Sequence, residues 1–153
     1  MFSGKFYHQM DEKNRIRIPP ECKSELGDTL YFMAGANGCL YVYPYAKGEQ
    51  ELRALLDKVD MYDPDDEYGQ ALTYLASIGF KAQPDKTGRI VLNRDLIKHA
   101  GITKNIVTVA LVDRLQIWSE ETWNERFDLT AKKYDNILRK KKHGDAQKSD
   151  GSN

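Results

Sequence analysis

The stretch Asp11-Glu12-Lys13-Asn14-Arg15-Ile16 is matched 74 positions later by Asp85-Lys86-Thr87-Gly88-Arg89-Ile90. The same offset pairs Gly27 with Gly101 and Thr29 with Thr103. After one additional residue in the second copy, Leu40–Tyr43 is matched by Leu115–Trp118. Self-similarity at a fixed offset indicates a duplicated structural unit. The sequence therefore predicts two copies of one unit within its 153 residues.

Each matched stretch reads as a tight turn between two strands. Lys5–Met10 and Phe80–Gln83 alternate enough to predict strands, and each ends in residues that favour turns. In Pro84–Gly88 the proline comes early and the glycine stands where a positive φ is expected. Asn14 occupies the position of Gly88 in the first copy, and asparagine tolerates positive φ better than most residues. A β-hairpin is therefore predicted at the start of each copy.

The rest of each copy follows the same order of a strand, a short helix, two strands and a longer helix. The short helices open at Pro19-Pro20-Glu21 and at Asn93, a residue that caps helix N-termini well. Asp63-Pro64 is expected to cap a further helix. The predicted boundaries are a first unit over 1–60, a connecting helix over 61–79, a second unit with a C-terminal helix over 80–138, and a disordered polar tail over 139–153. The fold class predicted is α+β, mainly β.

Composition places the chain among soluble globular proteins. It has no run of about 18 apolar residues, which a membrane span needs, and no signal-peptide pattern at its start. We therefore expect a cytoplasmic protein. Cys22 and Cys39 fit that reducing compartment. The histidines are scattered and the cysteines lack ligand spacing, so neither a metal nor any other cofactor is expected.

The net charge is zero, with 23 basic and 23 acidic residues, but the charges are unevenly distributed. Residues 5–23 and 81–98 are rich in lysine and arginine, whereas residues 57–67 are rich in aspartate and glutamate. Local placement, rather than the sum, sets the potential that a ligand meets. A nucleic-acid binder is therefore compatible with the neutral total.

Several motifs in this repeated frame resemble the MraZ family, in which both repeats have the swapped-hairpin β-barrel fold also found in AbrB and SpoVT. The motifs are Met1-Phe2-x-Gly4, Asp11-x-x-x-Arg15, Leu40-Tyr41-Val42-Tyr43-Pro44, Asp85-x-x-Gly88-Arg89, His99-Ala100-Gly101-Ile102 and Trp118-x-x-x-x-Trp123. Two positions depart from the family pattern. Asn14 replaces a glycine common in the first loop, and Gly48 stands where an aromatic residue is common.

The resemblance implies two AbrB-like units with flanking helices, in a regulator of the division and cell-wall gene cluster. It further implies binding to direct DNA repeats upstream of that cluster, including the protein's own promoter, and a nucleoid-associated protein. Such proteins form ring-like homo-oligomers whose D-x-x-x-R loops face double-stranded DNA. Several loops on one ring would add their contacts through effective concentration.

The residues themselves give a chemical reason for DNA contact at the loops. An aspartate and an arginine four positions apart can pair across the neck of the hairpin, which assigns Asp11, Asp85 and Gly88 to shaping the loops. Lysine and arginine bind phosphates, and arginine, asparagine and threonine also reach base edges. The predicted DNA-binding residues are Arg15, Arg89, Lys13, Asn14, Arg17, Lys81, Lys86 and Thr87, with Arg17 and Lys81 as phosphate contacts.

Three alternatives differ from this interpretation. Both Asp–Arg pairs could be structural hairpin locks that bind nothing. An enzyme would need an acid–base set such as His8 and Asp11, but the spacing along a strand points these side chains to opposite faces, and no catalytic motif is present. A protein-binding module of antitoxin type could use the same fold, although both hairpins are retained here and the polar tail is short.

Overall fold

A computed structural model describes residues 2–151, and the chain forms two compact units, residues 1–120 and 121–153. Within the described residues the strands are β1 (Phe2–Gln9), β2 (Arg15–Arg17), β3 (Leu30–Ala34), β4 (Leu40–Pro44), β5 (Phe80–Ala82), β6 (Arg89–Val91), β7 (Asn105–Val112) and β8 (Arg114–Ser119). The α-helices are α1 (Lys23–Leu26), α2 (Tyr45–Leu56), α3 (Glu67–Ile78), α4 (Arg94–Ala100) and α5 (Glu120–Gly151). Two short 3-10 turns, Pro20–Cys22 and Ala36–Gly38, complete the order.

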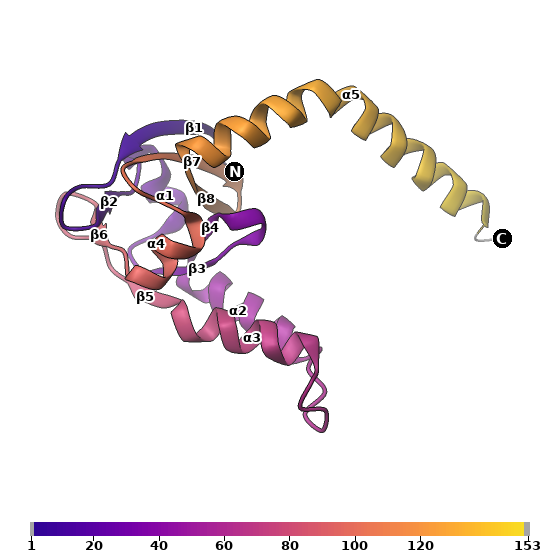
Figure 1. The fold of residues 1–153 in the computed structure, drawn as a ribbon, viewed down its shortest axis with the longest axis horizontal. Coiled ribbons are helices and arrows are strands. Elements are labelled where there is room, and N and C mark those ends of the chain that lie inside the picture. Colours follow the sequence, from indigo (N-terminus) through magenta and orange to yellow (C-terminus); the bar gives the residue numbers. More distant parts are fainter. Residues whose placement is uncertain (1, 152–153) are drawn as a thin grey trace. The chain divides into compact units, whose positions relative to one another are not determined.

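The two sequence copies interleave instead of forming separate sheets (Figure 1). Six strands lie in the order β1-β7-β8-β4-β3-β5, and β2 pairs with β6 in a separate two-stranded ribbon. Thus β1 of the first copy pairs with β7 of the second, and β5 of the second pairs with β3 of the first, all antiparallel. This exchange is the swapped-hairpin arrangement, and the fold class is α+β, mainly β, as predicted.

The core lies between the strands and the short helices. Alternation along the ribbon turns Ile16 and Ile90 inward, where both are buried, and leaves the flanking arginines outside. The fully buried aliphatic side chains of Leu30, Leu40 and Leu115 continue this core through the six-stranded sheet. Burying such a side chain contributes about 1.5–3 kcal/mol. The ribbon is therefore anchored to the core by one face only.

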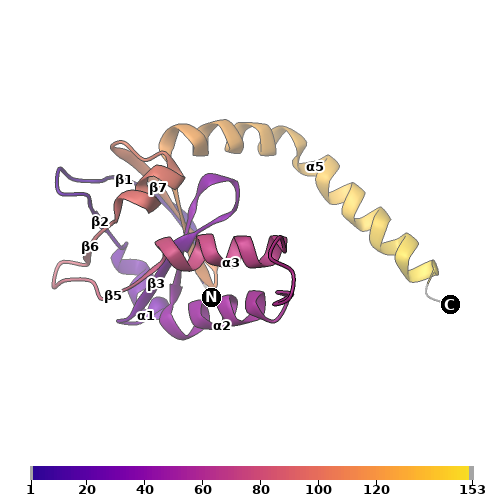
Figure 2. The same ribbon diagram turned by 60° about the horizontal axis from the view of Figure 1, so that its bottom comes forward.

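Helices α2 and α3 pack against each other and against β3 (Figure 2). Helix α4 contacts β3, β4 and β8. Its N-cap is Asn93, whose side chain accepts a hydrogen bond from Leu96 N at 2.8 Å, as predicted. Gly101 ends the helix with φ +60°, a left-handed conformation that glycine adopts easily.

The structure differs from the sequence prediction at two helix ends. Helix α3 begins at Glu67 and is capped by Asp66, whose carboxylate accepts from Gly69 N at 2.8 Å. Asp63 instead accepts from Asp65 N at 2.9 Å and forms a local turn. An aspartate two residues before a free amide can close such a turn without starting a helix.

Helix α5 runs on to Gly151, across most of the segment predicted as a disordered tail over 139–153. Arg139–Lys142 are good helix formers. They extend the preceding helix although they carry no apolar face, which is the feature on which the prediction rested. Residues 152 and 153 of that tail, and Met1 of the opening motif, lie outside the described residues. Among the described helices, none is long and apolar enough to cross a membrane.

Candidate nucleic-acid interface

The first loop is built around the carboxylate of Asp11. Its Oδ1 accepts hydrogen bonds from the backbone amides of Lys13 and Arg15, both at 2.9 Å. Its Oδ2 accepts from Nε of Arg15 at 2.7 Å, so an ion pair closes the neck of the hairpin as predicted. Asn14 takes the positive φ of +59° that the turn requires. One aspartate therefore fixes both the backbone of the loop and the direction of Arg15.

The second loop repeats the backbone geometry but not the ion pair. Oδ1 of Asp85 accepts from the amides of Thr87 and Arg89 at 2.8 and 2.9 Å, and from Oγ1 of Thr87 at 2.7 Å. Gly88 has φ +79°. The third donor to Asp85 is thus the hydroxyl of Thr87, which reaches Oδ1, whereas the guanidinium of Arg15 donates to Oδ2 of Asp11. Arg89 forms no ion pair within the part of the chain that the structure describes.

Each loop is hydrogen-bonded to the other copy of the repeat. Ile18 N donates to Gly88 O at 2.9 Å, and Leu92 N donates to Asn14 O at 2.9 Å. Ile18 and Leu92 are themselves related by the 74-residue offset, so the two contacts are equivalent under the internal repeat. The positive-φ residue of each loop therefore presents its carbonyl group to the partner hairpin. The two loops form one rigid element rather than two independent tips.

The electrostatics of both aspartates follow from these contacts. Hydrogen bonds from the backbone amide of Arg15 lower the pKa of Asp11, and the Arg15 side chain adds to the effect. The backbone amide of Arg89 and the hydroxyl of Thr87 lower the pKa of Asp85. Both carboxylates are consequently ionised at neutral pH and act as acceptors inside the loops.

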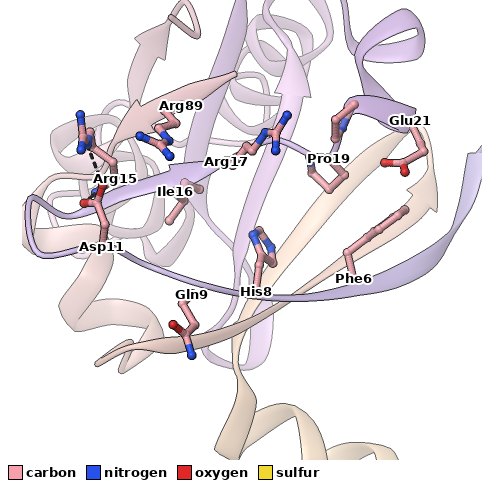
Figure 3. Close-up of a pocket in the computed structure, with 11 residues that line it drawn as sticks. Phe6, His8, Gln9, Asp11, Arg15, Ile16, Arg17, Pro19, Glu21 and Arg89 are labelled. Carbon is pink, nitrogen blue, oxygen red and sulfur yellow. Dashed lines mark hydrogen bonds and ion pairs between the residues drawn. The ribbon is translucent and has the colours of Figure 1, made fainter. Parts of the chain in front are cut away.

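The outer face of the ribbon gathers three arginines. Arg15 and Arg17 are two positions apart on β2 and share a face, and Arg89 lies opposite Arg17 in the register of β2 and β6. Figure 3 shows these guanidinium groups along a hollow of about 420 Å³, with Arg89 drawn between Arg15 and Arg17. Apolar side chains, including Phe6 and Ile16, form part of its wall. The arrangement offers a positively charged surface with an apolar floor.

Of the remaining predicted contact residues, some lie on the two loops and one, Lys81, lies on strand β5. Lys13 and Lys86 are exposed on their loops. Thr87 is exposed but its hydroxyl donates to Asp85. Lys81 lies apart from the loops: its Nζ is 4.7 Å from the ring centroid of Tyr45, at the start of α2. On strand β5 it faces away from buried Ala82, which explains this placement.

Two lysines that the sequence did not predict as DNA contacts also line hollows beside the loops. Lys23 of α1 lines one with Arg17 and Lys86. Lys104, just before β7, lines another with Lys13 and Arg15. Lys23 belongs to the basic segment over residues 5–23, so the charge pattern of the sequence already pointed to it. Nothing in the local sequence marks Lys104, because only the pairing of β1 with β7 brings it beside the first loop.

His8, which was considered for an acid–base set, and His99 both have structural partners. Nε2 of His8 is 2.6 Å from Oγ1 of Thr108, and burial lowers the pKa of His8. His99 bridges the hydroxyl of Tyr74 and the carbonyl of Gly35. Among the described residues no group of three or more histidine, cysteine, aspartate or glutamate side chains could hold a metal ion.

Comparison with known proteins agrees with this architecture. A family model described as "MraZ protein, putative antitoxin-like" matches residues 1–67 and 76–140. The chain belongs to the MraZ family.

Three relatives, each named "Transcriptional regulator MraZ", show the extent of the similarity. The protein of Clostridium acetobutylicum is 36% identical over 126 residues, which cover 82% of this chain and 86% of the relative. That of Lactobacillus johnsonii is 33% identical over 137 residues, covering 90% and 94%. That of Clostridium tetani is 35% identical over 129 residues, covering 84% and 88%. The similarity therefore spans both repeats, and the relatives' names describe regulators, not enzymes.

Proposed function

We propose that this MraZ-family protein is a sequence-specific DNA-binding regulator whose contact surface is the β2–β6 ribbon with its two loops. The observation that carries the proposal is the outward row of Arg15, Arg17 and Arg89 on an element made from both repeats. Arginine binds phosphates and reads guanine edges through paired donors. Because only one face of the ribbon is anchored in the core, the arginine face is free to approach a duplex.

Within this proposal the residues take different roles. Arg15 reads base edges, Arg89 is the main contact of the second loop, and Lys13, Lys86 and Arg17 contact phosphates. Asn14 and Thr87 reach the DNA backbone from the loop tips. Asp11, Asp85 and Gly88 shape the loops without touching DNA, since a carboxylate facing phosphate is repelled. The hydrogen bonds around both aspartates support this assignment. Lys81, whose Nζ is 4.7 Å from the ring centroid of Tyr45, is proposed as a further phosphate contact outside the ribbon.

One copy of the chain offers few contacts, so affinity is proposed to come from several copies. A homo-oligomeric ring that presents its ribbons to direct repeats gains affinity through effective concentration. Each phosphate neutralised adds about −0.9 to the slope of log affinity against log salt. The same proposal includes binding to direct repeats upstream of the division and cell-wall gene cluster and to the protein's own promoter. It also includes association with the nucleoid in the cytoplasm.

The test is a comparison of two duplexes of equal length and base composition, one from upstream of the protein's own gene and one scrambled. Fluorescence anisotropy at two salt concentrations is expected to show tighter binding to the upstream duplex, with a steep salt dependence. A duplex in which one direct repeat is scrambled is expected to bind more weakly than the intact one. Equal affinity for the upstream and scrambled duplexes would contradict the proposal.

A protein-binding module is the second candidate, and helix α5 is the observation that favours it. Phe127, Tyr134 and Leu138 are between 44% and 56% exposed along this helix. An arm with exposed apolar side chains is what an antitoxin uses to hold a protein partner. Copurification of a stoichiometric second polypeptide, without preference for the upstream duplex, is the outcome that would favour this function.

A further inference from the structure

The exchange of hairpins brings two arginines of different repeats directly opposite each other. Arg17 of β2 pairs with Arg89 of β6, next to the pair formed by Ile16 and Ile90. Residues directly opposite in an antiparallel pair have their Cβ atoms about 4.5–5.5 Å apart. Because both isoleucines are buried, both arginine side chains must leave the ribbon on its outer face. Both belong to the wall of the hollow in Figure 3.

Within the described residues neither arginine of this pair is held in an ion pair, and Asp85 interacts with Arg89 only through the weaker electrostatic effect that helps to lower the pKa of that carboxyl group. Asp11 holds Arg15 through an ion pair of 2.7 Å, so that guanidinium is compensated. Burial lowers the pKa of His8 in the same hollow, so its ring contributes no charge at neutral pH. Like charges directly opposite each other on a sheet are destabilising, and an anion between them removes that cost.

The surroundings fit a small anion. Three arginines line the hollow and outnumber its two carboxylates, Asp11 and Glu21. Phe6, Ile16 and Pro19 give it apolar walls, which strengthen the attraction between opposite charges. A Cβ built on Gly88 would lie 3.8 Å from Cγ of Arg17, so the stem of that arginine lies close to the second loop. The backbone of that loop is fixed by the hydrogen bond from Ile18 N to Gly88 O. The second loop thus helps to position both guanidinium groups.

We propose that Arg17 and Arg89 form a two-guanidinium site for one phosphate group, with one arginine supplied by each repeat. The site rests on the proposed function in one respect, because the phosphodiester of a DNA backbone is one source of the phosphate group. A free phosphate ion is the second source of the same group. Two planar guanidinium groups can each donate paired hydrogen bonds to phosphate oxygens. The two loops are therefore unequal, because Arg15 is braced by Asp11 whereas Arg89 is available to the ligand.

Inorganic phosphate is the first probe, used with the full chain. Thermal unfolding is measured in sodium chloride and in sodium phosphate at equal ionic strength for the wild type, Arg17→Gln, Arg89→Gln and the double variant. Arg53→Gln is the matched control, because Arg53 is an exposed arginine on α2 that pairs with Glu49. Phosphate stabilises folded proteins in general through exclusion from their surfaces, so the site is measured by the difference between variants.

The wild type and Arg53→Gln are expected to show the same rise in Tm in phosphate, and the three ribbon variants a smaller one. In chloride, Arg17→Gln is expected to be at least as stable as the wild type because the repulsion is gone. Phosphate binding is also followed by ³¹P line broadening at a temperature where every variant is folded. Equal phosphate responses in all five proteins would overturn the site.

The second probe separates the two sources of phosphate. Single phosphodiesters of the upstream duplex are replaced by uncharged methylphosphonates, and one position is expected to weaken wild-type binding by about tenfold but to have no effect on the Arg17→Gln/Arg89→Gln variant. An arginine-dependent response to inorganic phosphate, without preference for the upstream duplex, would support the site while contradicting the proposed function. Tight duplex binding that is indifferent to both arginines and to every methylphosphonate would overturn the site alone.

Discussion

At the scale of single residues, the loops depend on two ionised carboxylates. Asp11 and Asp85 each accept from two backbone amides, and each has one further donor, Arg15 Nε or Thr87 Oγ1. These hydrogen bonds lower the pKa of both groups from the ordinary value of 3.8. A group with a lowered pKa in the folded state stabilises the fold above its unfolded pKa. That stability is lost as the pH falls through the lower, folded pKa.

The replacement of both aspartates by asparagine tests this linkage. The wild type is expected to have a higher Tm than Asp11→Asn/Asp85→Asn at about pH 6, where the carboxylates are ionised. The difference is expected to shrink at about pH 3, because protonation removes the charge that the amides and Arg15 stabilise. Thermal unfolding by circular dichroism at both pH values measures it. A difference that is the same at both would show that the carboxylates contribute shape and not charge.

At the scale of elements, helix α2 reaches β3 through a residue without a side chain. Gly48 is buried, and a Cβ built on it would lie 2.7 Å from Cβ of Tyr31. An aromatic residue, which the family commonly has at this position, would not fit beside Tyr31. The Cβ of Tyr31 and the adjoining edge of its ring therefore take the space that a helical side chain would fill. The departure from the family pattern at Gly48 is a matter of packing between these two elements.

Gly48→Ala is expected to destabilise the protein although alanine is the better helix former by about 1 kcal/mol. Forcing an extra carbon into a packed interface costs about 1–3 kcal/mol. In a Tyr31→Gly background both the obstructing Cβ and the ring are absent, so the same substitution is expected to be neutral or stabilising. Urea unfolding of the four proteins gives the coupling energy between the two sites. An equal effect of Gly48→Ala in both backgrounds would refute the packing explanation.

Much of each element was predictable, because the signals are local. The turn residues, the positive φ at Asn14 and Gly88 and the cap at Asn93 follow from residue type and position. The cap at Asp66 was missed because Asp63-Pro64 carries the stronger local signal but closes a turn. The prediction ended helix α5 at residue 138, where its apolar stripe ends, but the helix continues to Gly151 because helix propensity does not depend on an apolar face.

At the scale of the whole molecule, the exchange of strands between the repeats could not be read from either copy alone. The pairing of β2 with β6 joins residues 72 to 76 positions apart. Hydrophobic alternation says which residues face inward, but it does not say which strand lies alongside. For this reason the sequence assigned Arg17 and Arg89 to different repeats but did not indicate that they lie opposite each other. The family resemblance implied the exchange; local patterns did not.

The central claim is that the arginine face of the β2–β6 ribbon is the DNA-contact surface. Its most direct test is fluorescence anisotropy on the upstream duplex with the wild type, Arg15→Ala, Arg89→Ala, the double variant and the control Arg53→Ala. The double variant is expected to bind at least about tenfold more weakly, Arg89→Ala to lose more than Arg15→Ala, and the control to match the wild type, all at unchanged oligomer size. Wild-type affinity in the double variant would show that the hairpins are structural locks and that DNA, if bound, contacts another surface.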